Sequence, residues 1–529
     1  MAQDMTKAFH DGFMPLSQSP IWDLQKQYYR ESSIHAWESG AVPSYITTTP
    51  VIARSYARIM GGFFDDYSRL SVTGKGEQRR RYIFELGAGS GCFAYRFLKY
   101  FANERAKLPA GGVDIVYVMT DISDATIDFW RQHPLLIRYV EAGLLDFAKL
   151  DCLDDKPVRL LISDRKITPG SLKTPMAVIG NYVIDSLPHD IFTLEDGKLK
   201  ARLVRAEIPD NSGTIAEMVR KTGFDYREED CPPSPYEVRD YNRILNHCRA
   251  IGGSLHFSLP TGGFRMMERM AALSTGPCFF LCGDFGASHI AALRDLPPRR
   301  VARNGAYSVH VNFHAMAEYA TARRGRAFLS DSPKSSLEIA GFLYRPGRRR
   351  PRRLVERFDL YVNEFGPEEF FLLKKSLEKQ LAVLPLSRIL GLLQLSGWDT
   401  KMFNLAAPGL LRDLPKASQA ERESLLKMLR AVDDMHFRCD SLSDPVFAIL
   451  KILLMLNERE AAYEILKRNE PLARENAEMR LKFAEVYRLF EAEEEALRII
   501  TELIAENPHF DAAKELADAL GKDATIAKA

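Results

Sequence analysis

Residues 83–93, IFELGAGSGCF, set a glycine-rich turn between two different hydrophobic patterns. Residues 83–86 are mostly apolar, as in a buried strand, and apolar residues recur at helical spacing from residue 93 onward. Glycines between a strand and a helix mark the place where α/β proteins bind ligands. The stretch therefore predicts a ligand site at the carboxyl end of a strand.

The spacing of the glycines excludes two common phosphate-binding turns. Gly87, Gly89 and Gly91 form G-x-G-x-G, whereas a dinucleotide cradle has G-x-G-x-x-G, and Cys92 occupies its third glycine position. A P-loop is excluded because no Gly-Lys-Ser/Thr follows. Glu85 stands two positions before the first glycine. The pattern Glu-x-Gly-x-Gly-x-Gly resembles the first signature of class I S-adenosylmethionine-dependent methyltransferases.

This resemblance implies S-adenosylmethionine as the cofactor and gives each residue of the turn a role. Gly87 and Gly89 leave space for the backbone to approach the cofactor, and Gly91 lets the helix pack close to the sheet. Glu85 would bind the cofactor's ammonium group directly or through water.

Two further carboxylates follow the next strands. Asp121 ends the strand 114–121 and would accept hydrogen bonds from ribose hydroxyls, because neighbouring strand ends share one edge of the sheet. Asp151, after a third strand, is the candidate partner of the adenine amino group. Each carboxylate alone is more often a helix cap or a solvated charge, and it is their succession after the glycine turn that indicates a binding site.

The wider chain reads as several parts. Residues 76–335 alternate short apolar runs with helical patterns, which predicts a Rossmann-like methyltransferase domain with a mostly parallel, doubly wound sheet. Its strands are expected at 82–86, 114–120, 176–183, 253–259, 278–285 and 307–313. Residues 1–75 are expected to form a helical cover that makes one wall of the substrate cleft.

The C-terminal half is predicted to be helical. Residues 336–358 contain seven arginines and read as a solvated linker, with an anionic docking patch as the alternative. In residues 359–529, Ala462 and Ala496 lie 34 positions apart, which is the tetratricopeptide period. A TPR-like domain is predicted here, and a bundle of plain antiparallel helices is the alternative.

Composition limits the partners and the location. The 529 residues carry a net charge of +2, so no global field argues for nucleic acid as the main partner. The seven cysteines form no CxxC pair, which favours a reducing compartment. The N-terminus lacks a signal or transit pattern, and the apolar run 446–456 is too short to span a bilayer. We expect a cytoplasmic protein without membrane insertion.

An ordered set of motifs from residue 40 to 325 resembles the MidA-like methyltransferases, the group that includes the mitochondrial complex I assembly methyltransferase. The segment 177–192, with Asn181, Asp185 and Pro188, is similar to the family's Asn-x-x-x-Asp-Ala-Leu-Pro. Further matches lie at 45–60, 235–238, 279–288 and 307–320. The chain departs from the family at Tyr182, where the family has Glu, and at Asn312, where it has Asp.

Catalytic candidates come from the same segments. Asp185 is the first candidate to orient or deprotonate the methyl acceptor, because it follows the fourth strand, where ligands converge. Asn181, His189 and Glu237 are secondary candidates. No metal site is predicted, since methyl transfer requires none and His310 and His314 straddle a strand-to-helix passage.

The sequence therefore predicts an S-adenosylmethionine-dependent methyltransferase that acts on a protein recruited by the C-terminal helices. Arginine is the acceptor that the resemblance implies, although the departures at 182 and 312 remove carboxylates that would orient a guanidinium. A small-molecule acceptor and a catalytically silent scaffold are the alternatives.

Overall fold

The structure, a computed structural model, divides into two compact units, Met1–Leu373 and Lys374–Ala529, which are described separately. The residues that it describes are 11–38, 42, 44–68, 80–108, 114–209, 213–294, 297–303, 305–334, 336–348, 350–438, 444–473 and 476–526.

The first unit is built on a seven-stranded sheet of order β16-β17-β11-β6-β1-β2-β3. Its strands are β1 (Arg81–Leu86), β2 (Ile115–Asp121), β3 (Leu145–Lys149), β6 (Met176–Asn181), β11 (Cys278–Asp284), β16 (Arg326–Phe328) and β17 (Glu338–Tyr344). Strand β17 pairs antiparallel with both neighbours, and the other pairs are parallel. The predicted α/β class with a mostly parallel sheet is confirmed.

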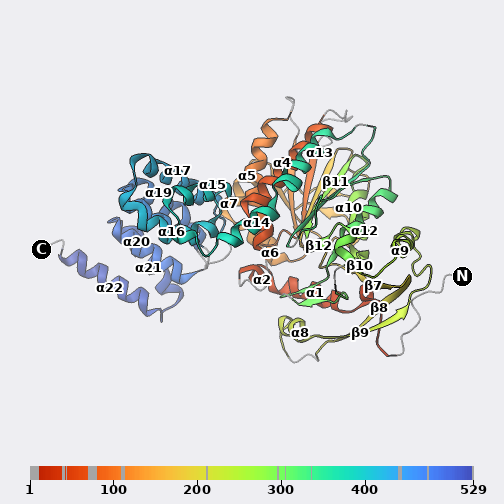
Figure 1. Cartoon of the computed structure of the whole chain (residues 1–529). Helices are drawn as coiled ribbons and strands as arrows, with labels where there is room; N and C mark the ends of the chain where they lie inside the picture. The colour runs from red at the N-terminus through yellow and green to blue at the C-terminus, as the bar shows by residue number, and fades with distance from the viewer. Residues whose placement is uncertain are drawn as a thin grey trace. The chain divides into compact units, whose positions relative to one another are not determined.

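Helices cover both faces of this sheet. Helices α4 (Pro50–Tyr67) and α5 (Cys92–Ala106) pack side by side on one face, and α10 (Thr261–Ala272) and α12 (Phe313–Ala322) lie on the other (Figure 1). Every residue of β1, β2, β11 and β17 is buried as a result. Two-sided burial explains why these strands are continuous apolar runs and not alternating patterns.

A second, antiparallel sheet has the order β10-β7-β8-β9. Its strands are β7 (Asp190–Glu195), β8 (Lys198–Glu207), β9 (Gly223–Asp230) and β10 (Leu255–Leu259). The expectation that residues 253–259 belong to the main sheet is wrong, because β10 pairs with β7. Residues 307–313 likewise form only the short strands β14 (Tyr307–Ser308) and β15 (Val311–Asn312), outside the main sheet. An apolar run shows that a strand is buried without showing which partner it pairs with.

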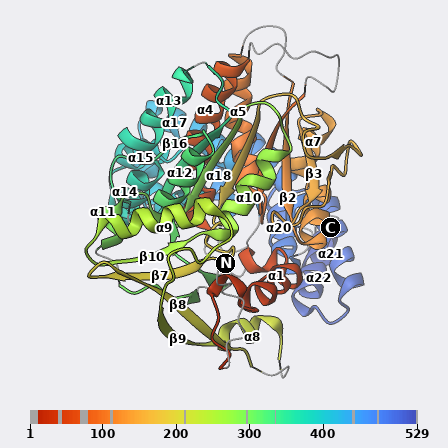
Figure 2. The ribbon, with the colours of Figure 1, turned by 90° about the vertical axis from the view of Figure 1, so that its right-hand side faces the viewer.

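Helix α1 (Ile21–Ser32) packs against α8 (Ile215–Lys221) beside the small sheet (Figure 2). Ile21 and Leu24 share an apolar cluster with Val204 and Val219. This contact fixes the helix that forms one wall of the site described below.

The prediction of a linker at residues 336–358 has to be corrected, because most of this segment forms regular structure. Strand β17 comes from its first part, and Arg352–Phe358 forms helix α13. The backbone amide of Leu354, in the first turn of α13, donates to the Asp66 carboxylate at 2.9 Å. The arginine count suggested a solvated segment, but Leu354 and Phe358 of α13 are buried, and of the apolar residues on this helix only Val355 is exposed.

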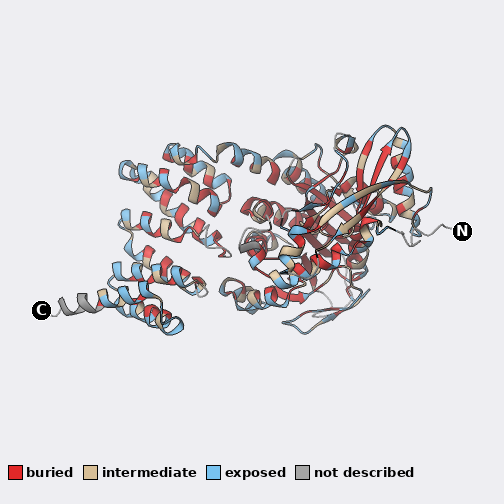
Figure 3. Ribbon diagram, turned by 90° about the horizontal axis from the view of Figure 1, so that it is seen from below, coloured by how far each residue is buried: buried red, intermediate tan, exposed pale blue. Residues whose placement is uncertain are grey.

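The described part of the second unit is built from helices, as predicted. They include α15 (Leu386–Leu395), α16 (Thr400–Asp413), α17 (Gln419–Met435), α18 (Val446–Met455), α19 (Arg459–Asn469), α20 (Ala477–Leu489), α21 (Glu493–Glu506) and α22 (Asp511–Ile526). Buried and exposed positions alternate along them (Figure 3). Ala462 and Ala496 are both fully buried, in α19 and α21. That these helices are TPR repeats stays a prediction.

The apolar run near the C-terminal end forms α18, which has ten residues. Across the residues that the structure describes, no helix is both long enough and apolar enough to cross a membrane.

Candidate functional site

The carboxyl ends of β1, β2 and β6 and the start of α5 surround a cavity of about 180 Å³ in the first unit. Its walls contain six of the ten residues that the sequence singled out: Glu85, Gly87, Gly89, Asp121, Asp151 and Asn181. The glycine turn and the three carboxylates are therefore brought together, as the succession of strand ends predicted.

The glycine turn needs glycine for its backbone conformation. Gly87 and Gly89 have φ of +58° and +53°, a left-handed region that side chains with a Cβ rarely adopt. Gly91 does not line the cavity. A Cβ there would lie 3.0 Å from Met119 of β2 and 3.3 Å from the indole of Trp130, so this glycine serves the close packing of helix and sheet.

Glu85 is a buried carboxyl group at the end of β1. Its Oε2 accepts a hydrogen bond of 3.0 Å from the hydroxyl of Tyr117 on β2. Burial raises the pKa of Glu85 to about 8, against the opposing effect of the Tyr117 bond. A cation that enters the cavity would favour the ionised form, so this group is suited to hold an ammonium.

Asp121 is held by backbone amides at the end of β2. Its Oδ1 accepts from Ile122 and Ser123 at 2.8 and 3.1 Å, and its Oδ2 lies 3.4 Å from the amide nitrogen of Gly89. Burial raises the pKa of Asp121 to about 6, while these amides oppose the shift. Near neutral pH the carboxylate is ionised and can accept hydrogen bonds from hydroxyl groups.

Helix α1 completes the cavity and supplies residues that the sequence did not single out. Lys26 pairs with Asp151, with 2.9 Å between Nζ and Oδ2, so the third carboxylate is already neutralised by a protein cation. Trp22, Gln25 and Tyr29 line the same wall. The expected helical cover is thus a wall of the cavity.

These donors and acceptors fit S-adenosylmethionine and do not fit a dinucleotide. Glu85 and Asp121 are acceptors, which suit an ammonium group and ribose hydroxyls. The pyrophosphate of a dinucleotide would instead face two carboxyl groups and be repelled when they are ionised. Apolar walls from Leu86, Phe93 and Leu150 suit the less polar parts of the cofactor.

Asp185 lies just behind the cavity wall. It is 9% exposed and is not among the cavity-lining residues, whereas its neighbour Ser186 is. The Ser186 hydroxyl donates to Asp185 Oδ1 at 3.0 Å. Burial raises the pKa of Asp185 to about 7. Asp284, which accepts the backbone amide of Asp185 at 3.2 Å, has its pKa raised well above the usual range by burial and by the charge of Asp185.

Asn181 ends β6 and lines the cavity. Its Oδ1 accepts from the Tyr56 hydroxyl at 2.9 Å, which fixes the amide so that Nδ2 is the free donor. Nδ2 is buried and has no hydrogen-bond partner among the described residues. The next residue, Tyr182, has φ of +52°, a strained conformation that is common at functional sites.

The other two catalytic candidates lie outside the cavity. His189 is fully buried, and its Nδ1 lies 2.8 Å from the carbonyl oxygen of Leu187. Burial lowers the pKa of His189 to about 4, so the ring is neutral near pH 7. Glu237 is exposed and does not line the cavity. A role for either residue stays a prediction.

Sequence reasoning also missed Ser186, Lys26 and Tyr117 as site residues. Ser186 could have been found, because a hydroxyl beside a candidate base suggests a proton path. No feature of the sequence pointed to Lys26, since its contact with Asp151 depends on how α1 folds over the sheet. Tyr117 reads as an ordinary core aromatic in an apolar strand.

Residues 70–330 match the family model described as "Putative S-adenosyl-L-methionine-dependent methyltransferase". Among proteins with curated descriptions, none matches the chain significantly.

Among the solved structures that resemble the chain are these three. The first is an uncharacterized protein from Burkholderia thailandensis, with 15% identity, coverage of 60% of this chain and 74% of that one, and a TM-score of 0.35. A protein from the same organism bound to S-adenosylhomocysteine has 17% identity, coverage of 60% and 73%, and a TM-score of 0.37. A complex of DhpI with SAH has 12% identity, coverage of 62% and 98%, and a TM-score of 0.26.

The matched residues hold six of the seven strands of the main sheet, all except β17, together with the glycine turn and the three carboxylates of the cavity. Residues 70–330 therefore form a domain of this family of S-adenosylmethionine-dependent methyltransferases, and S-adenosylmethionine is its cofactor.

Proposed function

We propose that the chain methylates a nitrogen on a protein side chain, with arginine as the first candidate acceptor. Bound S-adenosylmethionine supplies an activated methyl group, and the task of the protein is to align the acceptor and remove its proton. The observation that carries the proposal is the contact between Ser186, on the cavity wall, and Asp185 behind it.

A nitrogen that gains a methyl group in this reaction must lose one proton. In the proposed path, the N–H proton passes to the Ser186 hydroxyl oxygen as the Ser186 proton passes to Asp185 Oδ1. Asp185 can accept it, because a pKa of about 7 leaves a large ionised fraction near neutral pH while favouring proton uptake. Burial and the charge of Asp185 raise the pKa of the neighbouring Asp284 well above its usual range.

Asn181 and Tyr29 are proposed to position the acceptor. The unpartnered Asn181 Nδ2 can donate to an oxygen or to a nitrogen lone pair in the cavity. Tyr29, from α1, also lines the cavity and hydrogen-bonds with Ser186. Its pKa is raised by burial and by the charge of Asp185, so it remains a neutral donor.

The helical second unit supports a protein substrate, because arrays of antiparallel helices present extended surfaces for peptides. A small-molecule acceptor is the second candidate. It is favoured by the cavity itself, in which the carboxyl groups of Glu85, Asp121 and Asp151 are assigned to the cofactor and none is left beside Asn181 to hold a guanidinium. A cytoplasmic setting belongs to the proposal, since the six described cysteines are free thiols.

The test uses S-adenosylmethionine with a tritiated methyl group, incubated with the full chain and with protein and small-molecule fractions of a cell extract. Acid-precipitable label that is recovered as methylarginine after hydrolysis supports the proposal, and label only in the small-molecule fraction supports the second candidate. Asp185→Asn is expected to remove transfer while cofactor affinity stays within a few fold. Cofactor binding with no label in either fraction would favour a silent scaffold.

A further inference from the structure

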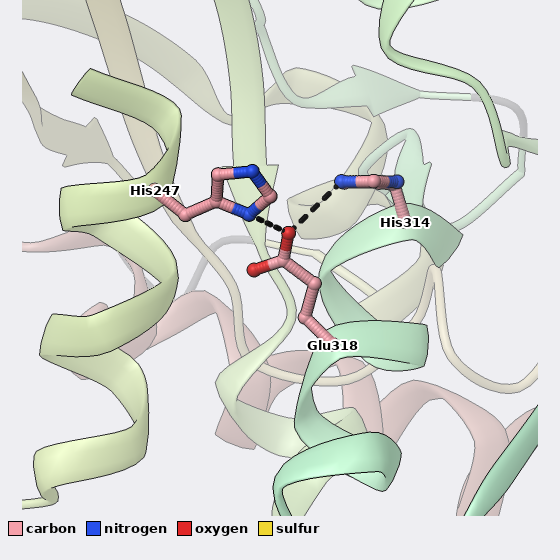
Figure 4. Close-up of side chains that lie close together, drawn as sticks. All are labelled: His247, His314 and Glu318. Atoms are coloured by element: carbon pink, nitrogen blue, oxygen red, sulfur yellow. Dashed lines mark hydrogen bonds and ion pairs between the residues drawn. The ribbon is translucent and has the colours of Figure 1, made fainter. Parts of the chain in front are cut away.

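A cluster of two histidines and one glutamate lies outside the cofactor cavity, on the first unit. His247 comes from α9 (Arg239–Ile251), and His314 and Glu318 come from α12, which packs against α9. Figure 4 shows the three side chains pointing toward one another. None of them lines the cavity, so the cluster has no part in the proposed methyl transfer.

The two imidazoles converge on one carboxylate oxygen. His314 Nε2 lies 3.0 Å from Glu318 Oε1, and His247 Nδ1 contacts the same oxygen. One candidate ligand atom from each residue lies within 4.8 Å of the others. Because His314 and Glu318 are four residues apart on one helix, they stand on the same face, and the second helix supplies the third group.

We propose that His247, His314 and Glu318 form a binding site for Zn²⁺. Zinc takes imidazole nitrogen and carboxylate oxygen at about 2.0–2.2 Å, commonly with three protein ligands and one water. Tetrahedral ligands at these lengths are roughly 3.4 Å apart, so modest side-chain rotation brings the three atoms into place.

The charge and the tautomers of the cluster suit a cation. The carboxylate is negative, and a neutral imidazole presents a lone pair when its proton lies on the other ring nitrogen. For His247 that other nitrogen is Nε2, and its side chain is 51% exposed, so water can accept this proton and a metal ion can enter. Arg243 donates to the backbone carbonyl of Glu318, which leaves the carboxylate oxygens to the histidines.

Bound zinc would join α9 to α12 and stabilise this part of the first unit. The prediction from the sequence was that no metal is bound, and the pair considered there was His310 with His314. The structure gives these residues different surroundings. His310 packs its ring against Phe285, with 4.8 Å between ring centroids, while His314 contacts Glu318. The ligand that the sequence pattern did not reveal is His247, 67 residues away from His314 along the chain.

The experiment is a titration of the full chain, stripped with a chelator, with Zn²⁺ by calorimetry and by competition with a zinc indicator. We expect one zinc ion per chain, and at least tenfold weaker binding in His247→Gln, His314→Gln and Glu318→Gln. His509→Gln, an exposed histidine in the second unit, is the matched control and should bind as the parent does.

A second metal ion and a variant at an exposed position make the test decisive. Co²⁺ should give the visible absorption of a four- or five-coordinate site in the parent chain and lose it in Glu318→Gln. Because His247 is half-exposed, His247→Gln should fold even if substitution of the less exposed His314 or Glu318 prevents folding. The proposal is overturned if the parent chain binds no zinc, or if the three variants bind it as tightly as the His509→Gln control.

Discussion

Replacement of Glu85 by glutamine tests whether this carboxylate holds the cofactor's ammonium group. In the free protein burial keeps the pKa of Glu85 near 8, so ionisation must precede or accompany binding. At pH 6.5 about 3% of a group with this pKa is ionised, and at pH 7.5 about 24%, which is roughly an eightfold rise. Over the same pH interval the protonated fraction of the cofactor's α-amino group, which is the form that Glu85 would bind, falls by about a third.

The product of the two changes predicts that S-adenosylmethionine binds the parent chain about fivefold more tightly at pH 7.5 than at pH 6.5. The sign follows from the raised pKa: the ionised form that binds is scarce below pH 8 and grows as the pH rises. Asp121, with a pKa of about 6, adds a small change in the same direction. Calorimetry in two buffers of different ionisation enthalpy should show release of nearly one proton at pH 6.5.

Glu85→Gln should abolish this rise with pH. A hydrogen bond to a charged group contributes about 1.5–3 kcal/mol, and the cost of ionising Glu85 at pH 7.5 is about 0.8 kcal/mol, so affinity there should fall about tenfold. The Tyr117 bond lowers the pKa of Glu85, so Tyr117→Phe should shift the affinity profile toward higher pH. A parent profile that is flat from pH 6.5 to 7.5, or a variant that keeps the rise, would refute the reasoning.

Three other substitutions test separate parts of the structure. Gly89→Val should weaken cofactor binding more than a hundredfold, because a β-branched side chain both enters the cavity and strains a φ of +53°, and unchanged affinity by calorimetry would contradict the assignment of the turn. Asn181→Ala should leave cofactor affinity within a few fold but lower the rate of methyl transfer, and an unchanged rate would remove Asn181 from the acceptor site. Ser418→Ala removes the capping box of α17 and should lower the free energy of unfolding by about 1 kcal/mol in a urea titration, with no effect on cofactor binding.

The cofactor half of the site could be predicted because local sequence determines it. Glycines with a required backbone conformation follow a buried strand, and Asp121 and Asp151 follow the next strands, so sheet topology alone brings these groups to one edge. The pairing of Lys26 with Asp151 could not be predicted, since it depends on the packing of α1 against α8 and the small sheet.

The acceptor half was less predictable. The strand-end rule favoured Asp185 as a group inside the cavity, yet the turn after β6 brings Ser186 to the wall and buries Asp185 behind it. The rule locates a segment to within a few residues, and side-chain direction within a turn depends on local backbone geometry such as the left-handed Tyr182.

Strand β17 was missed for a related reason. It lies directly before the arginine-rich stretch, and the change in composition suggested a domain boundary there. The main sheet pairs β17 antiparallel with β11, with Ala340 opposite Cys282, which lies 58 residues earlier in the chain, and composition carries no information on such pairing.

The most direct test of the account is a calorimetric titration of the purified chain with S-adenosylmethionine, S-adenosylhomocysteine and NAD under one set of conditions. The account predicts micromolar binding of the first two and no binding of NAD, because the cavity offers carboxylates to an ammonium group and to ribose hydroxyls but no cradle for a pyrophosphate. Binding of NAD, or no binding of either S-adenosyl compound, would contradict it.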